Sequence, residues 1–253
     1  MASSPNPGTV LVTGAAQRLG RAIALHFASQ GWHVAVHYHR SSADAAALVH
    51  EIESLGAEAV ALNANLADVA ELARLVRDCA DRLAAPTCLV NNAACYEWDT
   101  LASMNGDSWN AHLDVNLRAP IFLTQAFAAA LPAEASGNVI NIIDQKVLNP
   151  DPDYFSYTIA KSALWAATKA MAQALAPSIR VNAVGPGPVF PSVQQDMATF
   201  EREWRATPLR KEVAPHEICA AIQFLLDTSS ITGQMIAVDS GQHLAWRSEK
   251  AGG

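Results

Sequence analysis

Cysteine is scarce in this sequence, and its few cysteines form no recognisable site. The four, Cys79, Cys88, Cys95 and Cys219, make no CxxC pair and show no Cys/His spacing typical of bound zinc. The eight histidines form no HExxH pattern. We therefore expect reduced thiols that serve mostly in packing, with no disulfide framework and no metal site.

Long apolar runs and clusters of positive charge are absent as well. Nowhere are eighteen consecutive residues apolar, and the opening MASSPNPGT lacks the basic and apolar regions of a signal peptide. Lysine and arginine are scattered and the formal net charge is −7, so the chain has no electrostatic footprint for nucleic acid. These absences predict a cytoplasmic enzyme that acts on a small molecule, without nucleic-acid or membrane partners.

The sequence does contain a regular alternation of β-type apolar runs and helical patterns along its 253 residues. No Pro/Gly/Ser-rich linker interrupts it. We predict one α/β domain over residues 1–253, a Rossmann-like, doubly wound parallel sheet of about seven strands with helices on both faces. The expected strands are 9–13, 32–38, 57–63, 87–92, 138–143, 179–184 and 234–239, and the expected helices include 43–55, 68–84, 107–131, 155–176 and 215–227.

The first strand-to-helix turn has the sequence TGAAQRLG, residues 13–20. Open parallel sheets bind ligands beyond the carboxyl ends of their strands. Gly14 and Gly20 allow a tight turn and close helix packing, and the start of the next helix offers N–H groups and a positive dipole end to a pyrophosphate. Glycines also simply end strands, so this turn alone does not establish phosphate binding.

The end of the second strand indicates which dinucleotide would bind. In NAD enzymes an acidic residue here accepts hydrogen bonds from the adenosine ribose, but this chain has Tyr38, His39, Arg40 and Ser41. A guanidinium and a hydroxyl suit a 2′-phosphate, which an aspartate would repel. The pattern favours NADP(H) over NAD(H), and the alternative is a solvated arginine on a loop.

Tyr157 and Lys161 are the clearest indication of chemistry. They stand four residues apart on an expected helix and therefore share one face. An ammonium beside a phenol favours the phenolate, so we expect Lys161 to lower the pKa of Tyr157 from its usual value of about 10. Tyr157 would then exchange a proton with a substrate, while the lysine could also bind a nicotinamide ribose. The alternative is a pair of residues on a solvated helix face.

Asp144 and Asn116 extend this cluster. Asp144 follows the apolar run Asn-Ile-Ile at a strand end, where a carboxylate would accept from a substrate N–H or help to deliver a proton to a ring nitrogen. It could instead only cap the following loop. Pro120 lies four residues after Asn116 and cannot donate to its carbonyl. That carbonyl is then free for water, unless the proline only kinks the helix.

Four motifs follow one another in the order TGAAQRLG, VNNAA (90–94), Tyr157/Lys161 and PGPV (186–189). In this order the chain resembles the short-chain dehydrogenase/reductase family over nearly its whole length. Arg18 stands where the family usually has a third glycine, and Asp144 stands where it usually has a catalytic serine. Together with YHRS at 38–41, these departures are similar to the pteridine reductase and dihydromonapterin reductase branch.

The resemblance implies NADP(H) contacts spread along the chain. They are Gly14, Arg18, Leu19 and Gly20 at the pyrophosphate, His39, Arg40 and Ser41 at the 2′-phosphate, Asn65 and Leu66 at the adenine, Asn92 and Ala93 at the ribose, and Pro186, Gly187 and Val189 at the nicotinamide carboxamide, with Tyr157 and Lys161 beside them. The family's threonine beyond PGPV is missing, and Ser192 is the nearest hydroxyl. The resemblance further implies a water chain from Asn116 to Lys161, and a homotetramer formed through helices 107–131 and 155–176 and the last strand.

The resemblance also implies a substrate site made of Arg18, Tyr96, Asp144 and Tyr157, in which Tyr96 or its neighbour Trp98 stacks on the substrate. The predicted reaction is hydride transfer from NADPH to a C=N bond of a pteridine, dihydromonapterin or dihydrofolate, with Tyr157 as proton donor. A carbonyl reductase and an inactive NADP-sensing protein remain alternatives. Residues 190–211 would form a substrate lid, or pack their aromatic side chains as an ordinary helix.

Overall fold

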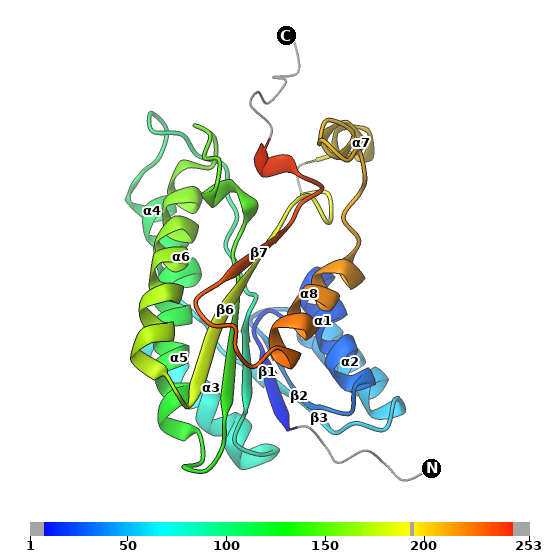
Figure 1. Cartoon of the computed structure of the whole chain (residues 1–253), viewed down its shortest axis with the longest axis vertical. Coiled ribbons are helices and arrows are strands. Elements are labelled where there is room, and N and C mark those ends of the chain that lie inside the picture. Colours follow the sequence, from blue (N-terminus) through cyan, green and yellow to red (C-terminus); the bar gives the residue numbers. More distant parts are fainter. Residues whose placement is uncertain (1–7, 193–194, 245–253) are drawn as a thin grey trace.

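The computed structural model describes residues 8–192 and 195–244. Its centre is a seven-stranded sheet with the order β3-β2-β1-β4-β5-β6-β7, in which all neighbours are parallel (Figure 1). This order confirms the predicted Rossmann-like, doubly wound sheet. The strands are β1 (Thr9–Val12), β2 (His33–Tyr38), β3 (Ala59–Asn63), β4 (Cys88–Asn91), β5 (Gly137–Ile142), β6 (Ile179–Pro186) and β7 (Met235–Val238).

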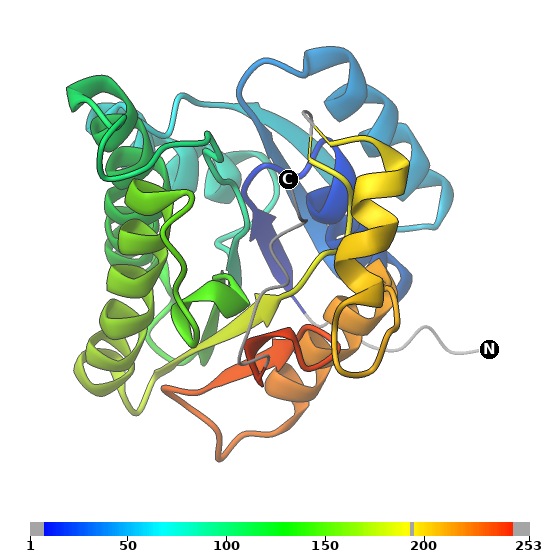
Figure 2. The same ribbon diagram turned by 90° about the horizontal axis from the view of Figure 1, so that it is seen from above.

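Helices cover both faces of the sheet, as Figure 2 shows from above. One layer consists of α1 (Arg18–Ser29), α2 (Ser42–Ser54) and α8 (Pro215–Asp227), and the other of α3 (Val69–Arg82), α4 (Gly106–Leu113), α5 (Ala119–Ala130) and α6 (Phe155–Leu175). Because β1 is covered on both faces, Val10, Leu11 and Val12 are fully buried, which explains its uninterrupted apolar run. A further helix, α7 (Met197–Arg205), lies beyond the carboxyl ends of the strands.

The order of the strands positions the site. β1 pairs with β2 on one side and with β4 on the other, so β2 and β3 extend the sheet on one side of β1 and the later strands extend it on the other. Such a switch point opens a crevice at the carboxyl edge of a parallel sheet. The glycine turn after β1 lies in this crevice.

The predicted helix 107–131 is not regular throughout. A π-helical segment, η1 (Asp114–Arg118), separates α4 from α5, and Ala119 N donates to Asp114 O, five residues back. Pro120 stands at the start of α5, where its missing N–H is tolerated. The structure therefore confirms an irregularity at Asn116 and identifies it as a π-bulge, a feature that often marks functional sites.

The predicted lid contains α7, and its residues 193–194 lie outside the described part of the chain. Phe200 is only 2% exposed, which agrees with the helix-packing alternative for that ring. Two short 3₁₀ segments complete the fold near the site: η2 (Gln145–Val147) after β5 and η3 (Gln242–Leu244) after β7.

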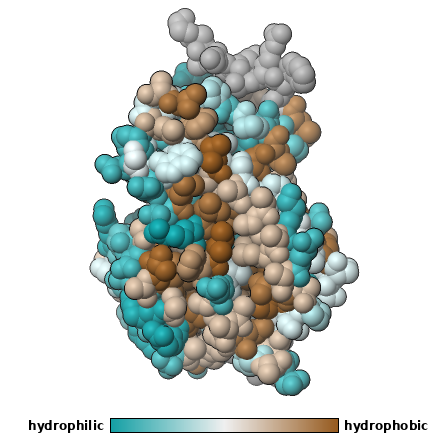
Figure 3. Space-filling model, turned by 90° about the vertical axis from the view of Figure 1, so that its left-hand side faces the viewer, coloured by the Kyte–Doolittle hydropathy of each residue, from teal (hydrophilic) through white to brown (hydrophobic). Residues whose placement is uncertain are grey.

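Figure 3 shows the face that α4, α5 and α6 cover, with an apolar band running down its middle. Phe122 on α5 and Ile159 on α6 are each 40% exposed. Across residues 8–192 and 195–244, no helix has the length and apolar character needed to cross a membrane.

Candidate active site

A cavity of about 810 Å³ opens at the carboxyl edge of the sheet. It brings together most of the residues that the sequence predicted, far apart as they are in the chain. Those lining it are Gly14, Arg18, Leu19, Gly20, His39, Arg40, Asn65, Leu66, Asn92, Ala93, Tyr96, Asp144, Tyr157, Lys161, Pro186, Gly187, Val189 and Ser192. Ser41, Asn116 and Trp98 do not line it.

Two positions of the glycine turn, Gly14 and Gly20, have no room for any residue other than glycine. Gly14 has a φ of 61°, and a Cβ added there would lie 3.0 Å from Ala93 Cα. A Cβ on Gly20 would overlap Gly14 O. The turn therefore packs α1 directly against the strand ends and leaves its backbone at the cavity wall, which fits the close approach of a pyrophosphate.

His37 holds this turn from the neighbouring strand. Its Nδ1 accepts from Gly14 N at 2.9 Å, and its Nε2 lies 3.1 Å from Ala64 O. Since Nδ1 accepts, the ring hydrogen sits on Nε2 and donates to the carbonyl. Burial lowers the pKa of His37 to about 4, so the ring is neutral. The sequence prediction missed this residue, whose only signal was a polar side chain inside an apolar strand.

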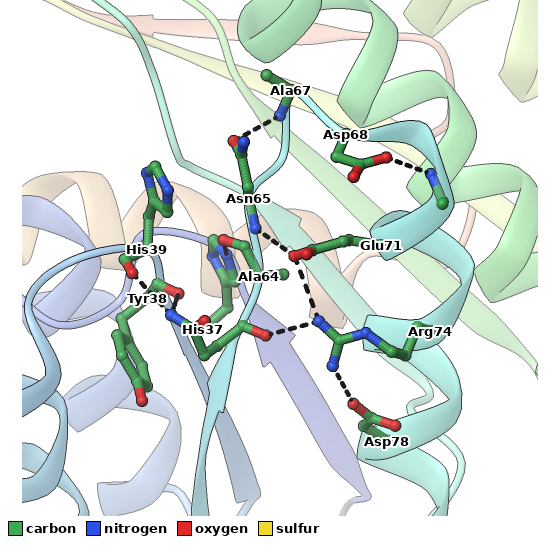
Figure 4. A network of polar contacts seen from close by, with 12 residues as sticks. His37, Tyr38, His39, Ala64, Asn65, Ala67, Asp68, Glu71, Arg74 and Asp78 are labelled. Atoms are coloured by element: carbon green, nitrogen blue, oxygen red, sulfur yellow. Dashed lines mark hydrogen bonds and ion pairs between the residues drawn. The ribbon is translucent and has the colours of Figure 1, made fainter.

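Loops after β2 and β3 meet at one end of the cavity (Figure 4). Asn63 Nδ2 donates to His39 O at 2.7 Å, and Glu71 Oε2 accepts from Asn65 N at 2.6 Å. Arg74 ties Glu71 to Asn63 O. These bonds fix the backbone from which His39, Asn65 and the exposed Arg40 reach the cavity, whereas Ser41 precedes α2 outside it.

Arg18 connects the glycine turn to the segment after β6. Its φ is 52°, a left-handed conformation that is uncommon outside glycine. The guanidinium donates from Nη2 to Pro191 O at 2.8 Å and lies 5.3 Å from the centre of the Phe190 ring. Its side chain therefore links the glycine turn with the segment after β6 across the cavity.

Tyr157 and Asp144 form the centre of the site. Tyr157 OH donates to Asp144 Oδ2 at 2.9 Å, and Asp144 Oδ1 accepts from Lys146 N at 2.8 Å. Asp144 thus lines the cavity and also caps the next segment, which confirms the capping alternative, while its role toward a substrate stays a prediction. Lys161 Nζ donates to Ile142 O at 2.8 Å and lies 5.7 Å from the centre of the Tyr157 ring.

The protonation of this centre differs from the sequence prediction. Burial and the Asp144 charge hold the pKa of Tyr157 well above its usual value, so the expected lowering by Lys161 is wrong for the protein alone. Burial also raises the pKa of Asp144 and lowers that of Lys161 to about 8. The phenol is therefore a hydrogen-bond donor, and the carboxyl beside it binds a proton more readily than an ordinary aspartate.

Asn116 lies behind the cavity wall. Its Oδ1 accepts from Cys95 N and its Nδ2 donates to Cys95 O, both at 2.8 Å. The fully buried side chain thereby fixes the loop after β4, and this bond pair explains why the side chain itself does not reach the cavity.

Tyr96 supplies an aromatic wall of the cavity beside Tyr157. Its ring stacks on Tyr154 at 4.3 Å with an interplanar angle of 11°, and meets Tyr157 edge-on at 4.8 Å. Trp98 is 53% exposed and outside the cavity, so the structure favours Tyr96 of the two. Tyr154, which lines the cavity too, was missed because it stands too far from Lys161 on a helix to act with it.

A doubly wound sheet, a glycine-only turn at its switch point and a buried Tyr/Lys/Asp centre define a dinucleotide-dependent oxidoreductase. A family model described as enoyl-(acyl carrier protein) reductase matches residues 14–243. The chain belongs to the short-chain dehydrogenase/reductase family, as its motifs predicted.

Similar proteins divide between two activities. Among curated proteins, the chain is 34% identical over 235 residues to the 3-oxoacyl-[acyl-carrier-protein] reductase of Synechocystis sp., covering 91% of this chain and 95% of that one. It is 31% identical over 241 residues to FabG of Staphylococcus aureus, with coverages of 93% and 98%.

The similar solved structures include FolM alternative dihydrofolate reductase 1 from Brucella canis, complexed with NADP. This structure has a TM-score of 0.93 and 41% identity, and the match covers 97% of this chain and 98% of that one. The Brucella suis protein, also with NADP, gives the same score and identity, with coverages of 97% and 99%.

Proposed function

We propose that this protein is an NADPH-dependent reductase that adds hydride to a C=N bond of a dihydropterin-like substrate, a pteridine, dihydromonapterin or dihydrofolate. The observation that carries the proposal is the hydrogen bond from Tyr157 to Asp144. A serine in place of Asp144 would donate to a substrate carbonyl, whereas this carboxyl group accepts from an N–H or, when protonated, supplies a proton. The FolM neighbours at 41% identity support the same substrate class.

The cavity fits NADP(H) along its length. The bare backbone at Gly14 and Gly20 leaves room for a pyrophosphate at the start of α1. His39 and Arg40 line the adenosine end without an acidic side chain at the end of β2, which suits a 2′-phosphate. Pro186, Gly187 and Val189 line the end near Tyr157, where the nicotinamide would lie. When bound, the cofactor supplies the hydride.

The residues of the chain would manage the proton. Tyr157 would donate its phenolic hydrogen to the ring nitrogen of the substrate as the adjacent carbon accepts hydride. Asp144, hydrogen-bonded to the same oxygen and with a raised pKa, would return a proton to Tyr157. Lys161, held by Ile142 O, would bind the nicotinamide ribose and stabilise negative charge that develops on the phenol. Tyr96 would stack on the pterin ring.

A carbonyl reductase is the second candidate. The curated relatives at 31–34% identity are 3-oxoacyl reductases, and the Tyr157/Lys161 pair would serve a ketone as well. The two candidates predict opposite substrate preferences, and an NADP-sensing protein predicts binding without turnover.

The deciding experiment is a side-by-side NADPH oxidation assay with dihydromonapterin, dihydrobiopterin, dihydrofolate and a panel of ketones. The proposal predicts turnover of at least one dihydropterin with a kcat/KM well above that of every ketone. Preference for a ketone would replace it with the carbonyl reductase, and NADPH binding with no turnover in the whole panel would leave only a sensing role.

We also infer that the face of α4, α5 and α6, together with β7, joins subunits of a homotetramer. The apolar band on this face (Figure 3) and the exposure of Phe122 on α5 and Ile159 on α6 support this inference. Light scattering after size exclusion gives the subunit number. Phe122→Glu, which places a charge on the exposed surface of α5, is expected to shift the subunit number toward smaller species. The segment 190–211, whose Phe190 and Ser192 line the cavity, is proposed to cover the bound substrate.

A further inference from the structure

A buried polar network lies directly behind the catalytic centre. Asp99, in the loop between β4 and α4, is only 2% exposed. Its Oδ1 accepts from Ser156 N at 3.0 Å, and its Oδ2 accepts from Ser156 Oγ and from Ser108 Oγ. Ser156 precedes Tyr157 in the sequence, so this carboxylate is bonded to the residue next to the proposed proton donor.

Asp99 supplies the acceptors that the start of α6 lacks. The N-cap residue, Tyr154, has no side-chain cap hydrogen bond and adopts a left-handed φ of 54°. Phe155 N donates instead to Asp99 O at 3.2 Å, and Ser156 N donates to the Asp99 carboxylate. The first N–H groups of a helix have no partner within it, and here a residue 57 positions earlier provides partners for two of them. The carboxylate also interacts favourably with the helix dipole.

His112 on α4 completes the network. Glu97 N donates to His112 Nε2 at 3.1 Å, so the ring hydrogen must sit on Nδ1, which donates to Ser156 Oγ at 2.6 Å. Ser156 can then donate its own hydrogen only to Asp99. The hydrogen bonds therefore run in one direction: Glu97 N donates to His112, His112 donates to Ser156, and Ser156 donates to Asp99. This direction requires an ionised Asp99 and a neutral His112.

The charge states of the two end groups agree with that direction. Burial alone would raise the pKa of Asp99, but the hydrogen bonds from Ser156 and Ser108 hold it below its usual value. Burial lowers the pKa of the fully buried His112. The His112 ring also lies 6.0 Å from the Tyr157 ring, edge to face. The network therefore reaches Tyr157 in two ways: through the backbone of the neighbouring Ser156, and through contact between the His112 and Tyr157 rings.

We propose that Asp99, Ser156 and His112 are positioning residues that fix the first turn of α6 and thereby aim Tyr157 at the substrate. The inference rests on the proposed role of Tyr157 as proton donor. Without the Asp99 carboxylate, the N–H of Ser156 loses its acceptor in a buried place, so the turn reorganises. Proton transfer depends on heavy-atom placement to within a fraction of an ångström, so a small shift of the phenol is enough to slow the reaction.

The test compares Asp99→Ala, Asp99→Asn, Ser156→Ala and His112→Ala with the wild type. Glu217→Ala is the matched control, because Glu217 Oε2 accepts from Ala214 N at the start of α8, a helix that contributes nothing to the cavity lining. Each folded variant is assayed for kcat and KM with the best substrate of the wild type, for the Kd of NADPH, and for amide hydrogen exchange in residues 155–158.

Asp99→Ala is expected to lower kcat at least tenfold while the Kd of NADPH stays within twofold, and to speed exchange of the amides of residues 155–158. Ser156→Ala keeps the backbone bond to Asp99 and is expected to lose less, about threefold to tenfold in kcat. The double variant Asp99→Ala/His112→Ala is expected to lose no more kcat than Asp99→Ala, because residues of one network are not additive. Glu217→Ala is expected to keep the kcat of the wild type even where its melting temperature falls.

A kcat within twofold of the wild type in folded Asp99→Ala or Asp99→Asn would overturn the proposal, as would a loss of kcat matched by an equal loss in Glu217→Ala. If Asp99→Ala does not fold, the kcat values of Ser156→Ala and Asp99→Asn decide whether the proposal stands. Tyr157→Phe is assayed in parallel: full activity in that variant would remove the proposed function of Tyr157, whereas the hydrogen exchange of residues 155–158 still reports whether Asp99 orders the turn.

Discussion

The phenol of Tyr157 donates to Oδ2 of Asp144 over 2.9 Å, while Oδ1 of the same carboxyl accepts from Lys146 N. One side chain thus holds the proposed proton donor and the backbone of the next segment at once. Asp144 is therefore part of the local structure as well as the proposed partner of Tyr157 in proton transfer, and variants of the two residues should separate these roles.

Tyr157→Phe removes the proton donor and leaves the ring. We expect kcat to fall by about 10²- to 10⁴-fold, the usual contribution of a positioned acid, because the hydroxyl that donates to Asp144 Oδ2 is lost. The Kd of NADPH, measured by fluorescence titration, should change by less than about threefold. Retention of more than a tenth of the activity would show that another group delivers the proton.

Asp144→Asn should stabilise the protein at neutral pH. Burial raises the pKa of Asp144 above that of the unfolded chain, so the folded protein binds the proton more tightly and the charged form costs stability above the folded pKa. That cost disappears as the pH falls below the unfolded value of about 3.9. The difference in melting temperature between variant and wild type should therefore be positive at pH 7 and vanish near pH 3.

The control for this measurement is Asp151→Asn, which removes a 40% exposed carboxylate paired with Lys146. Its melting temperature should stay within about 1–2 °C of the wild type across the same range, as expected for a surface ion pair. An Asp144→Asn variant that is less stable at pH 7 would contradict the argument.

His37 should make the stability of the folded protein depend on pH between about 4 and 6.5. Its pKa in the folded protein is about 4, below the ordinary histidine value of 6.5, so the unfolded chain binds the proton more tightly. The stability that the neutral ring provides is complete above pH 6.5 and is lost as the pH falls toward 4, a difference on the order of 3 kcal/mol. In His37→Gln this pH dependence should flatten, as measured by urea unfolding.

The same variant tests the link to the cofactor. His37→Gln should weaken NADPH binding several-fold, because Gly14 N loses its fixed acceptor. His50→Gln, in which an 82% exposed histidine is replaced, should change neither the affinity nor the pH dependence. Unchanged NADPH binding in His37→Gln would mean that the turn holds itself.

Arg40→Ala tests the choice of dinucleotide. If the guanidinium binds the 2′-phosphate, the Kd of NADPH should rise by about tenfold or more, while the Kd of NADH should hardly change. Arg77→Ala, on the exposed side of α3, is the control for net charge. An equal loss for both dinucleotides would place Arg40 outside the phosphate site.

The sequence was sufficient for those parts of the structure that depend on local patterns. The alternation of apolar runs gave the parallel sheet, and α8 has the predicted bounds 215–227. Gly14, Tyr157 and Lys161 reach one cavity because strand ends and helix starts meet at the same edge of a parallel sheet. The i, i+4 spacing of the tyrosine and lysine was also enough to bring them together.

The long-range polar contacts could not be predicted from the sequence. Nothing in the spacing of His37, Asp99 or His112 indicates that each meets a partner from another element. The direction of the pKa of Tyr157 was mispredicted for a related reason: the i, i+4 rule counts the ammonium but neither the burial nor the carboxylate that arrives from β5. Burial and cross-element charge depend on tertiary structure, which helix spacing does not describe.

The bond between Asp99 and Ser156 also has a consequence for how the protein folds. The start of α6 depends on an acceptor 57 residues earlier, so its first turn cannot be completed by local contacts. We expect a loop of that length to close late, after the segments on both sides have docked on the sheet. A peptide of residues 150–175 would therefore fray at Phe155, and a chain emerging during synthesis would have a sheet and helices before it has an ordered Tyr157.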